Sequence, residues 1–576
     1  MNTQRTMRAL ALLVGGVLMA GCAGIPSAGP VERVADDGGP GQSTVRYAPV
    51  GPPRGASPQQ ILRGYLDAML AYPVSTGVAA LYLTPDAARS WRSSEGVTVY
   101  TSPQVTLSES VLLDATDESV VVDLRTRQVA RLDRQGHYLE GTASEPRSYE
   151  LRKVKGQWRI SDPQDGVMVT RTYYDDYFRP FPLYFFDASG ERLVPDLVHL
   201  AVGDQLPTGL VTALARGPAN TPGAFRSYVP GAGSLRPSVT AGDDGVADVE
   251  FSASFAKLSD QQRDRLSAQI VWTLRSVLGL RGVRIFGGTP VLSARGERVH
   301  PIDSWGAYGP RSGDNHTYAL VDDKLVEIDG DIVQPVTGAW GRDAGGAVEA
   351  SVSDDAVAAL LPGADQVRIT DRDGKNPRDV TGAGFAPPKW DRDDHLWLVD
   401  RPAGSTRVRI VDDGRTRTMS ARGLRRLTVE SFALSPDGGR YALATGGKDP
   451  SLLVGPVRRD KDDRLTGLGD PRRLTIGVGD PHSVDWSSTT RLGFLGGSDA
   501  GIQLYNVALD GTDVTGGDTG GGPLLPDVDA TTLAGRAGED SARWVLDGRR
   551  RLWYFAPESS WRLIDDRRFT GLSTGD

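Results

Sequence analysis

A turn-and-strand pattern recurs at blade-sized intervals through roughly the last 270 residues, and it restricts the possible fold more than any other feature. A small or aromatic residue precedes a polar turn, and an apolar run follows. The corresponding positions Ser353, Asp391, Ser435 and Ser487 are 38, 44 and 52 residues apart. Spacing of roughly 40 to 50 residues, with several short strands per repeat, is typical of β-propellers. We therefore predict an all-β propeller over residues 304–576 with about six blades, although five or seven also fit its length.

The first 22 residues have the pattern of an export signal. Arg5 and Arg8 precede an uncharged run over residues 9–20, which is shorter than the ~20 apolar residues of a membrane-spanning helix. Two small residues then lead to Cys22, the only cysteine of the chain. This order is typical of a bacterial lipobox, although Met19 stands where leucine is commonest. We predict lipidation at Cys22; an ordinary signal peptide that happens to contain a cysteine is the alternative.

Lipidation would anchor the chain in the cell membrane, at its extracytoplasmic face, through diacylglyceryl and N-acyl groups on Cys22. With no second cysteine, an exported chain of this length must be held together by hydrophobic cores and not by disulfides. The net charge of −8 and the pI of about 5.5 come without a basic block. Nucleic acid is therefore not an expected partner.

Composition and periodicity divide the chain into five segments. We expect a lipoprotein signal peptide at 1–21 and a flexible stalk at 22–56, which is rich in Gly, Pro, Ser and Ala. An N-terminal α+β domain would follow at 57–172, then a second α+β domain at 173–303 and the propeller at 304–576. The fold class is thus multidomain.

The domain at 57–172 has local signals for helices followed by strands. Ser57-Pro58-Gln59-Gln60 predicts a capped helix start, and Thr84-Pro85 predicts a second one. Helices followed by a curved antiparallel sheet can form an NTF2-like cone. The predicted strands lie at 111–113, 120–122, 149–154 and 158–160.

The domain at 173–303 also has local signals for both strands and helices. Its predicted strands include 184–186, 246–251 and 283–286, and its predicted helices are Leu210–Arg216 and one that Ser259 opens. We expect this last helix to bury one apolar face and to end at Gly279. The residues of that face are Leu266, Ile270, Leu274 and Leu278.

Several of these stretches resemble one family, the actinobacterial lipoprotein LpqB. The segment from Cys22 to Val31 resembles the family's mature N-terminus, and Ser435-Pro436-Asp437-Gly438 resembles the blade signature of TolB-like propellers. The stretches that resemble a GerMN domain are 210–215, 217–218, 229–231, 249–252, 269–274 and 283–285. The resemblance covers essentially the whole chain after the signal segment.

The resemblance implies a role beside a sensor histidine kinase of a two-component system of the MtrA–MtrB type, linked to cell-envelope homeostasis and division. The partner that it implies is the kinase's extracellular domain. GerMN domains have no established catalytic residues, so the resemblance assigns none to this chain.

The sequence contains no motif for an enzyme, a cofactor or a metal. The six histidines, at 137, 199, 300, 316, 395 and 482, show no helical zinc spacing. A nucleophile elbow and a phosphate loop are both missing. A catalytic triad assembled from distant residues stays open, because triads are defined by geometry. We therefore assign no catalytic, cofactor-binding or metal-binding residue.

Two acidic clusters and a group of tryptophans each have two interpretations. The segment 371–376 resembles the start of a calcium loop but has Gly382 where a glutamate is expected. It and the cluster of Asp391, Asp393 and Asp394 are better explained as solvated turns that cap backbone amides. The tryptophans either pack between blades, which we favour, or anchor a partner on a propeller face. They are Trp390, Trp397, Trp486, Trp544, Trp553 and Trp561.

Three functions are compatible with these sequence features. We expect a surface adaptor that works by binding and is not an enzyme. The alternative is a carbohydrate- or cell-wall-binding propeller, and a hydrolytic propeller of this kind would need a close pair of carboxylates in a cleft. A carrier of lipids or peptidoglycan precursors would need a deep apolar cavity in the domain at 57–172.

Overall fold

The computed structural model describes residues 49–576 apart from 74, 108–117, 144–145, 219–223, 230–236, 253–254, 256, 289–290, 310–315, 500, 518–523, 527, 536–542, 556–559 and 576. Cys22, the signal segment at 1–21 and the predicted strand at 111–113 lie outside the described residues. The chain forms two compact units, Met1–Val129 with Thr142–Tyr174 and Ala130–Gly141 with Asp175–Asp576. Among the described helices, none is long and apolar enough to cross a membrane.

The first unit begins with the capped helix that its sequence predicts. In α2 (Pro58–Met69), the Ser57 hydroxyl accepts a hydrogen bond from the Gln60 backbone at 3.3 Å, and the Gln60 side chain accepts one from the Ser57 backbone at 2.8 Å. These bonds satisfy two amides that have no partner within the helix. The apolar face of α2 is buried and contacts β1, β5 and β6.

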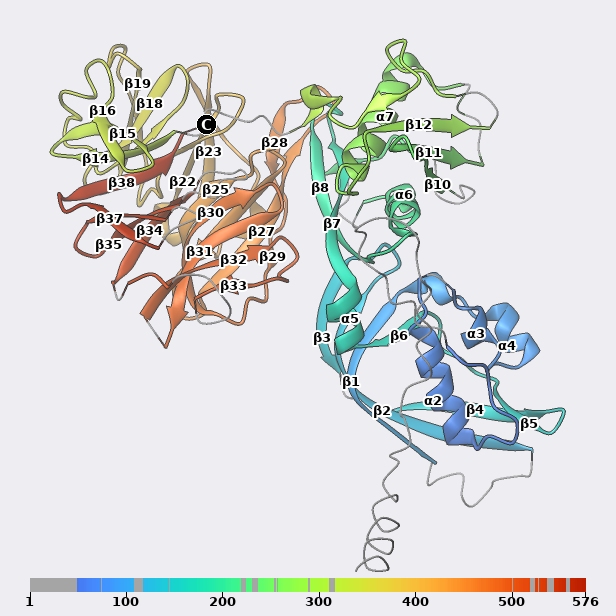
Figure 1. Cartoon of the computed structure of the whole chain (residues 1–576). Coiled ribbons are helices and arrows are strands. Elements are labelled where there is room, and N and C mark those ends of the chain that lie inside the picture. The colour runs from blue at the N-terminus through green and yellow to red at the C-terminus, as the bar shows by residue number, and fades with distance from the viewer. Residues whose placement is uncertain are drawn as a thin grey trace, which may run out of the picture. The chain divides into compact units, whose positions relative to one another are not determined.

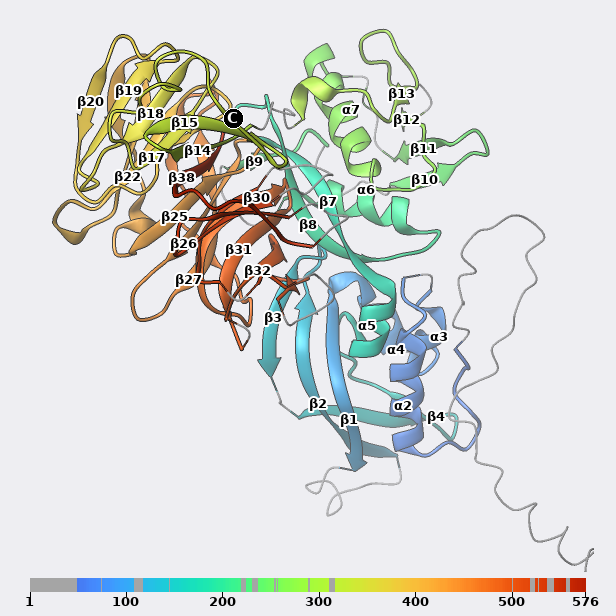
Figure 2. The ribbon, with the colours of Figure 1, turned by 60° about the vertical axis from the view of Figure 1, so that its left-hand side comes forward.

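A curved sheet with the strand order β5-β4-β2-β1-β6 follows, and β3 pairs with β2 (Figure 2). The end of β2 and most of β3 belong to the second unit. β1 and β6 run parallel, whereas β2, β4 and β5 are antiparallel neighbours. The predicted strands at 120–122, 149–154 and 158–160 are confirmed. The elements are α3 (Gly77–Ala80), α4 (Pro85–Ser90), β1 (Val97–Leu107), β2 (Ser119–Leu132), β3 (Tyr138–Ala143), β4 (Arg147–Val154), β5 (Gln157–Ile160), β6 (Val167–Thr170) and α5 (Arg171–Tyr177).

The second unit opens with two small sheets and two helices. One sheet has the order β8-β7-β9 and the other β10-β11-β12-β13. Helices α6 and α7 both contact β7, and α7 also contacts β12. The elements are β7 (Phe178–Asp187), β8 (Leu193–Ala201), α6 (Leu206–Arg216), β9 (Phe225–Arg226), β10 (Ser238–Ala241), β11 (Val246–Phe251), α7 (Asp260–Leu274), β12 (Gly282–Gly287) and β13 (His300–Pro301).

Both helices differ from their predicted bounds. Helix α6 begins one turn early, at Leu206. Helix α7 ends at Leu274 and not near Gly279, so the prediction that it buries Leu278 is wrong: that side chain is 98% exposed. The reason lies at the C-cap, Arg275, whose guanidinium donates to the carbonyls of residues 302 and 304 at 2.7 Å each. The chain turns there and carries Leu278 away from the core.

The propeller consists of six sheets among the described residues. In Figure 1 the C-terminal strand β38 lies beside β14, and these two strands are antiparallel partners. The innermost strands contact one another in the order β38, β17, β21, β25, β30, β34 and back to β38. The ring is therefore closed, which leaves no long sheet edge unpaired.

Each blade is defined by its strand bounds. The first contains β14 (Thr317–Val321), β15 (Lys324–Asp329), β16 (Ile332–Pro335) and β38 (Phe569–Thr574). The second and third contain β17 (Glu349–Val352), β18 (Ala356–Leu360), β19 (Gln366–Asp371), β20 (Arg378–Thr381), then β21 (Lys389–Trp390), β22 (Leu396–Asp400), β23 (Arg407–Asp412) and β24 (Arg415–Thr418). The fourth contains β25 (Val429–Leu434), β26 (Arg440–Thr445), β27 (Ser451–Arg459), β28 (Leu465–Leu468) and β29 (Arg472–Arg473). The last two contain β30 (Gly479–Ser488), β31 (Arg491–Ser498), β32 (Gly501–Ala508), β33 (Thr515–Gly516), then β34 (Ala530–Gly535), β35 (Arg543–Asp547), β36 (Leu552–Phe555) and β37 (Arg562–Asp565).

Serine side chains tie the innermost strands of adjacent blades together. The Ser431 hydroxyl accepts from the backbone of Val484 at 3.0 Å, and Ser483 accepts from Leu533 at 2.8 Å. Across the closure, Ser573 donates to the carbonyl of residue 350 at 2.6 Å. These bonds satisfy backbone groups at blade edges that the strand ladders leave unpaired.

Candidate functional site

The propeller tryptophans pack inside the protein. Trp397 and Trp544 are 1% and 0% exposed, and Trp390, Trp486 and Trp561 are at most 8% exposed. Trp397 stacks on Phe432 of the next blade, with 6.2 Å between the ring centres. The packing interpretation is therefore confirmed for these five tryptophans.

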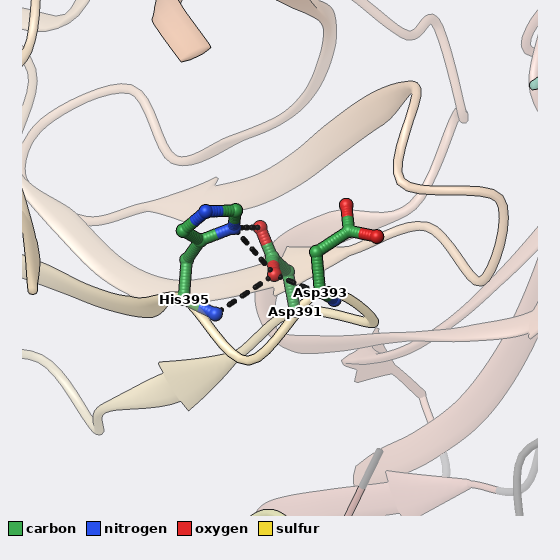
Figure 3. A group of neighbouring side chains, drawn as sticks. All are labelled: Asp391, Asp393 and His395. Carbon is green, nitrogen blue, oxygen red and sulfur yellow. Dashed lines mark hydrogen bonds and ion pairs between the residues drawn. The ribbon is translucent and has the colours of Figure 1, made fainter. Parts of the chain in front are cut away.

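The acidic cluster at 391–394 caps a turn between β21 and β22. Oδ1 of Asp391 accepts from the backbone amides of Asp393 and His395 at 3.0 Å each, and Oδ2 accepts from the Trp397 indole at 2.9 Å. The His395 imidazole lies against both oxygens (Figure 3). Asp371 caps its own turn similarly, at 2.7 Å from the Lys375 amide. Both clusters are turns, as the sequence predicts, but the prediction that they are solvated is wrong for Asp391, which is 3% exposed.

The chemistry of this cluster does not fit a metal ion, although ligand atoms of Asp391, Asp393 and His395 lie within 4.8 Å of one another. Asp391 is already surrounded by N–H donors. Oδ2 of Asp393 accepts from Arg192 at 2.8 Å and from Arg459 at 3.0 Å. A cation would have to displace two guanidinium groups from one carboxylate, so we assign no metal site here.

A buried ion network connects the β7–β8 hairpin to the propeller. Arg192, whose side chain is 7% exposed, pairs with Asp187 of its own hairpin and with Asp393 and Asp463 of two propeller turns. Arg459 pairs with Asp393 and Asp463 as well. Burial lowers the pKa of Arg192, but its acidic partners outweigh burial and raise it. The small sheets and the propeller are thus joined by charges with little access to water.

Two histidine–aspartate pairs add to this junction. The His137 imidazole lies 2.9 Å from Asp133 and 3.0 Å from Asp196. Burial lowers its pKa, but hydrogen bonds and attraction to both carboxylates outweigh burial and raise the pKa to about 10. His199 lies 2.7 Å from Asp510 of the propeller. Burial raises the pKa of Asp510, but the bond and attraction to His199 and the bonds from Thr512 together outweigh burial, so the pKa falls below the usual range.

A pocket of about 570 Å³ lies where these elements meet, entirely within the second unit. The β2–β3 turn, β3, β8, β9, the fourth blade and the turn after β32 of the fifth blade contribute its lining. Apolar side chains alternate in it with three arginines and four aspartates. Its lining residues are Asp133, His137, Tyr138, Leu139, Asp196, Leu197, Phe225, Arg440, Val454, Gly455, Pro456, Arg458, Asp470, Arg472, Leu509 and Asp510. A volume of this size suits a small ligand or part of a larger one.

Sequence reasoning did not find this site. His137 and Asp196 are 59 residues apart, and His199 and Asp510 are 311 apart. No local spacing links such pairs, so the histidines look scattered in the sequence. The one local signal was the turn at 133–136, which Asp133 caps by accepting from residues 135, 136 and 137 at 2.9 Å each.

The fold and the junction together define a class of protein. It is a multidomain protein in which a closed β-propeller is joined, through buried charges, to a small α+β domain of two sheets.

Three family models match the chain. "Lipoprotein LpqB, N-terminal domain" matches residues 51–175, "Sporulation and spore germination" matches 182–291, and "Lipoprotein LpqB beta-propeller domain" matches 323–559. The chain belongs to the LpqB lipoprotein family.

Relatives described as Lipoprotein LpqB match along almost the whole chain. That of Cutibacterium acnes is 29% identical over 89% of this chain and 90% of its own length. That of Thermobifida fusca is 26% identical over 93% and 97%. A solved TolB structure from Agrobacterium tumefaciens has a TM-score of 0.30 and 13% identity, over 44% of this chain and 88% of that one. The propeller assignment rests on the strand pairing described above and not on this likeness.

Proposed function

We propose that this lipoprotein is held at the extracytoplasmic face of the cell membrane through Cys22 and works as a binding protein. Its partner would be the extracytoplasmic domain of a sensor histidine kinase, of the MtrA–MtrB type, in envelope homeostasis and division. Membership of the LpqB family and the lipobox pattern at Cys22 support the anchor. The kinase is the partner that the family resemblance implies.

The observation that favours binding over hydrolysis is the state of two of the four aspartates that line the pocket. A glycoside hydrolase needs one carboxyl group that stays protonated, so its pKa must be raised. Asp133 and Asp510 line the pocket, yet bonds and attraction to neighbouring groups, chiefly His137 and His199, outweigh burial and lower the pKa of both. These carboxyl groups would be ionised at neutral pH and could not donate a proton to a leaving group.

Three described acids outside the pocket have the opposite behaviour, because burial raises the pKa values of Asp67, Glu349 and Asp437. Burial raises the pKa of Glu349, on the innermost strand β17, to about 7. The charged group that acts on it most is Lys389, which lowers the pKa. None of these three acids lines the pocket, and Glu349 lies near a lysine, so the cell-wall hydrolase alternative gains no support from them.

Photocrosslinking in living cells tests the proposal. A photoreactive residue would replace Leu278, which is 98% exposed beyond α7, or Ile332, which is 59% exposed on the propeller. The proposal expects covalent capture of the kinase's extracytoplasmic domain from at least one of these positions. A third probe at Arg415, on the outermost strand β24, serves as a matched exposed control.

The same experiment with Cys22→Ser tests the anchor. This variant should be released from the membrane, and capture of the kinase should fall sharply. Capture of only wall polymer, or of nothing reproducible from any probe position, would overturn the kinase partner. Unchanged membrane retention of Cys22→Ser would overturn the lipid anchor independently.

A further inference from the structure

One pocket-lining cation has an unused hydrogen-bond donor. Arg440 begins β26, where its backbone amide donates to the Ser435 hydroxyl at 2.9 Å. Its guanidinium lies over the Phe225 ring, 4.9 Å from the ring centre. Nη1 is buried and has no hydrogen-bond partner among the described residues. Buried guanidinium nitrogens are normally paired, because water no longer satisfies them.

Two of the other cations of the pocket, Arg472 and His137, are occupied by the protein itself, and the third, Arg458, is exposed to solvent. Arg472 donates to the carbonyl of Leu509 at 2.6 Å. His137 is held between Asp133 and Asp196. Among the described side chains that line the pocket, Arg440 is the one with a buried polar atom left unpaired. An acceptor group in the pocket would therefore satisfy a donor that the fold leaves unpaired on Arg440.

The charges of the lining favour an anion with a single charge. Three arginines and the doubly paired His137 face four aspartates. The formal charges cancel, so the pocket has no positive excess to stabilise a phosphate dianion. A planar carboxylate, in contrast, matches the donor fork of one guanidinium.

The remaining lining suits a hydrocarbon group attached to that anion. Phe225 lies beneath the guanidinium, and Leu197, Val454 and Pro456 also line the pocket. Leu139, which is 50% exposed, lies in the same lining. We propose that this pocket is a binding site for an organic carboxylate with an apolar body, and that Arg440 is the cation that holds it. The proposal is independent of the kinase partner.

Pairs of probes that differ only in charge test this site. Benzoate and benzamide have the same shape, and so do a Gly-Gly-Phe tripeptide with a free or an amidated C-terminus. Binding to the purified full-length protein would be measured by calorimetry. We expect the charged member of at least one pair to bind at least tenfold more tightly. Preference for benzoate would indicate a small acid, and preference for the free peptide a peptide terminus.

Two variants locate the binding. Arg440→Gln should weaken carboxylate binding at least tenfold and abolish the preference for the charged probe. Leu139→Trp fills the pocket from a half-exposed position and should block binding without removing a charge. The matched controls are Arg415→Gln on β24 and Leu563→Trp, which is 40% exposed on β37. Equal binding of charged and neutral probes, or unchanged binding in a folded Arg440→Gln or Leu139→Trp protein, would overturn the proposal.

Discussion

Replacing His137 with asparagine should destabilise the second unit in a pH-dependent way. The imidazole bridges Asp133 and Asp196 and is 13% exposed. Asparagine keeps a polar side chain but removes the positive charge, so two partly buried carboxylates lose their counter-ion. Because the hairpin at 130–141 and strand β8 meet through this histidine, we expect the loss to appear in the unfolding of the second unit.

The magnitude follows from the pKa. A rise from 6.5 to about 10 corresponds to about 5 kcal/mol at 1.36 kcal/mol per pH unit. Solvent reaches Asp133, which is 33% exposed, so we expect about 3 kcal/mol. A pKa that folding raises gives stability that is fully present below the unfolded value of 6.5 and is lost as pH rises through about 10. The difference between wild type and variant should therefore be largest near pH 6 and small at pH 10.5.

Denaturant unfolding followed by tryptophan fluorescence, at pH 6, 7, 8.5 and 10.5, measures this difference. His316→Asn, which removes a histidine 42% exposed, controls for the substitution itself and should cost at most about 1 kcal/mol. An NMR titration of the imidazole resonances gives the pKa of His137 directly. A destabilisation that does not change with pH, or a His137 pKa near 6.5, would refute the charged bridge.

Three further changes test other parts of the structure. Arg192→Met should lower the free energy of unfolding of the second unit by about 3–5 kcal/mol, because the buried Asp187 and the partly buried Asp393 and Asp463 lose a partner. Arg415→Met should change it by less than about 0.5 kcal/mol, and equal effects would show that the network adds no stability. Ser431→Ala should lower the free energy of unfolding by about 1–2 kcal/mol, since it leaves the Val484 amide unpaired between two blades. A hydrogen-exchange rate at that amide equal to the wild-type rate would contradict this. Glu349→Gln should stabilise the propeller by about 2 kcal/mol at pH 8 and have little effect at pH 4, because a carboxyl pKa raised to about 7 lowers stability as pH rises from 4.5 through 7. Thermal unfolding at both pH values measures that difference, and an effect independent of pH would argue against a buried carboxyl.

The sequence determined the elements whose signals are local. The Ser57 and Ser259 capping boxes join residues three positions apart, so the side chains alone specify where α2 and α7 begin. The turns of the propeller are also local, since Asp391 and Asp371 accept from amides two to four residues later. Turns of this kind at blade-sized intervals predicted the propeller, and Cys22 with its preceding apolar run predicts the lipid anchor.

Tertiary structure alone decided the pocket and the charged junction. Arg192 and Asp463 are 271 residues apart, and no periodicity could pair them. Leu278 shows that local sequence also fails to predict where a helix ends. It continues a helical pattern, yet the helix stops at Leu274 because Arg275 donates hydrogen bonds to carbonyls beyond it. Arg440 looks like any arginine at the start of a strand until the fold buries its guanidinium against Phe225. Local geometry is specified by neighbouring residues, whereas the environment of a charge depends on which distant segments the closed fold brings around it.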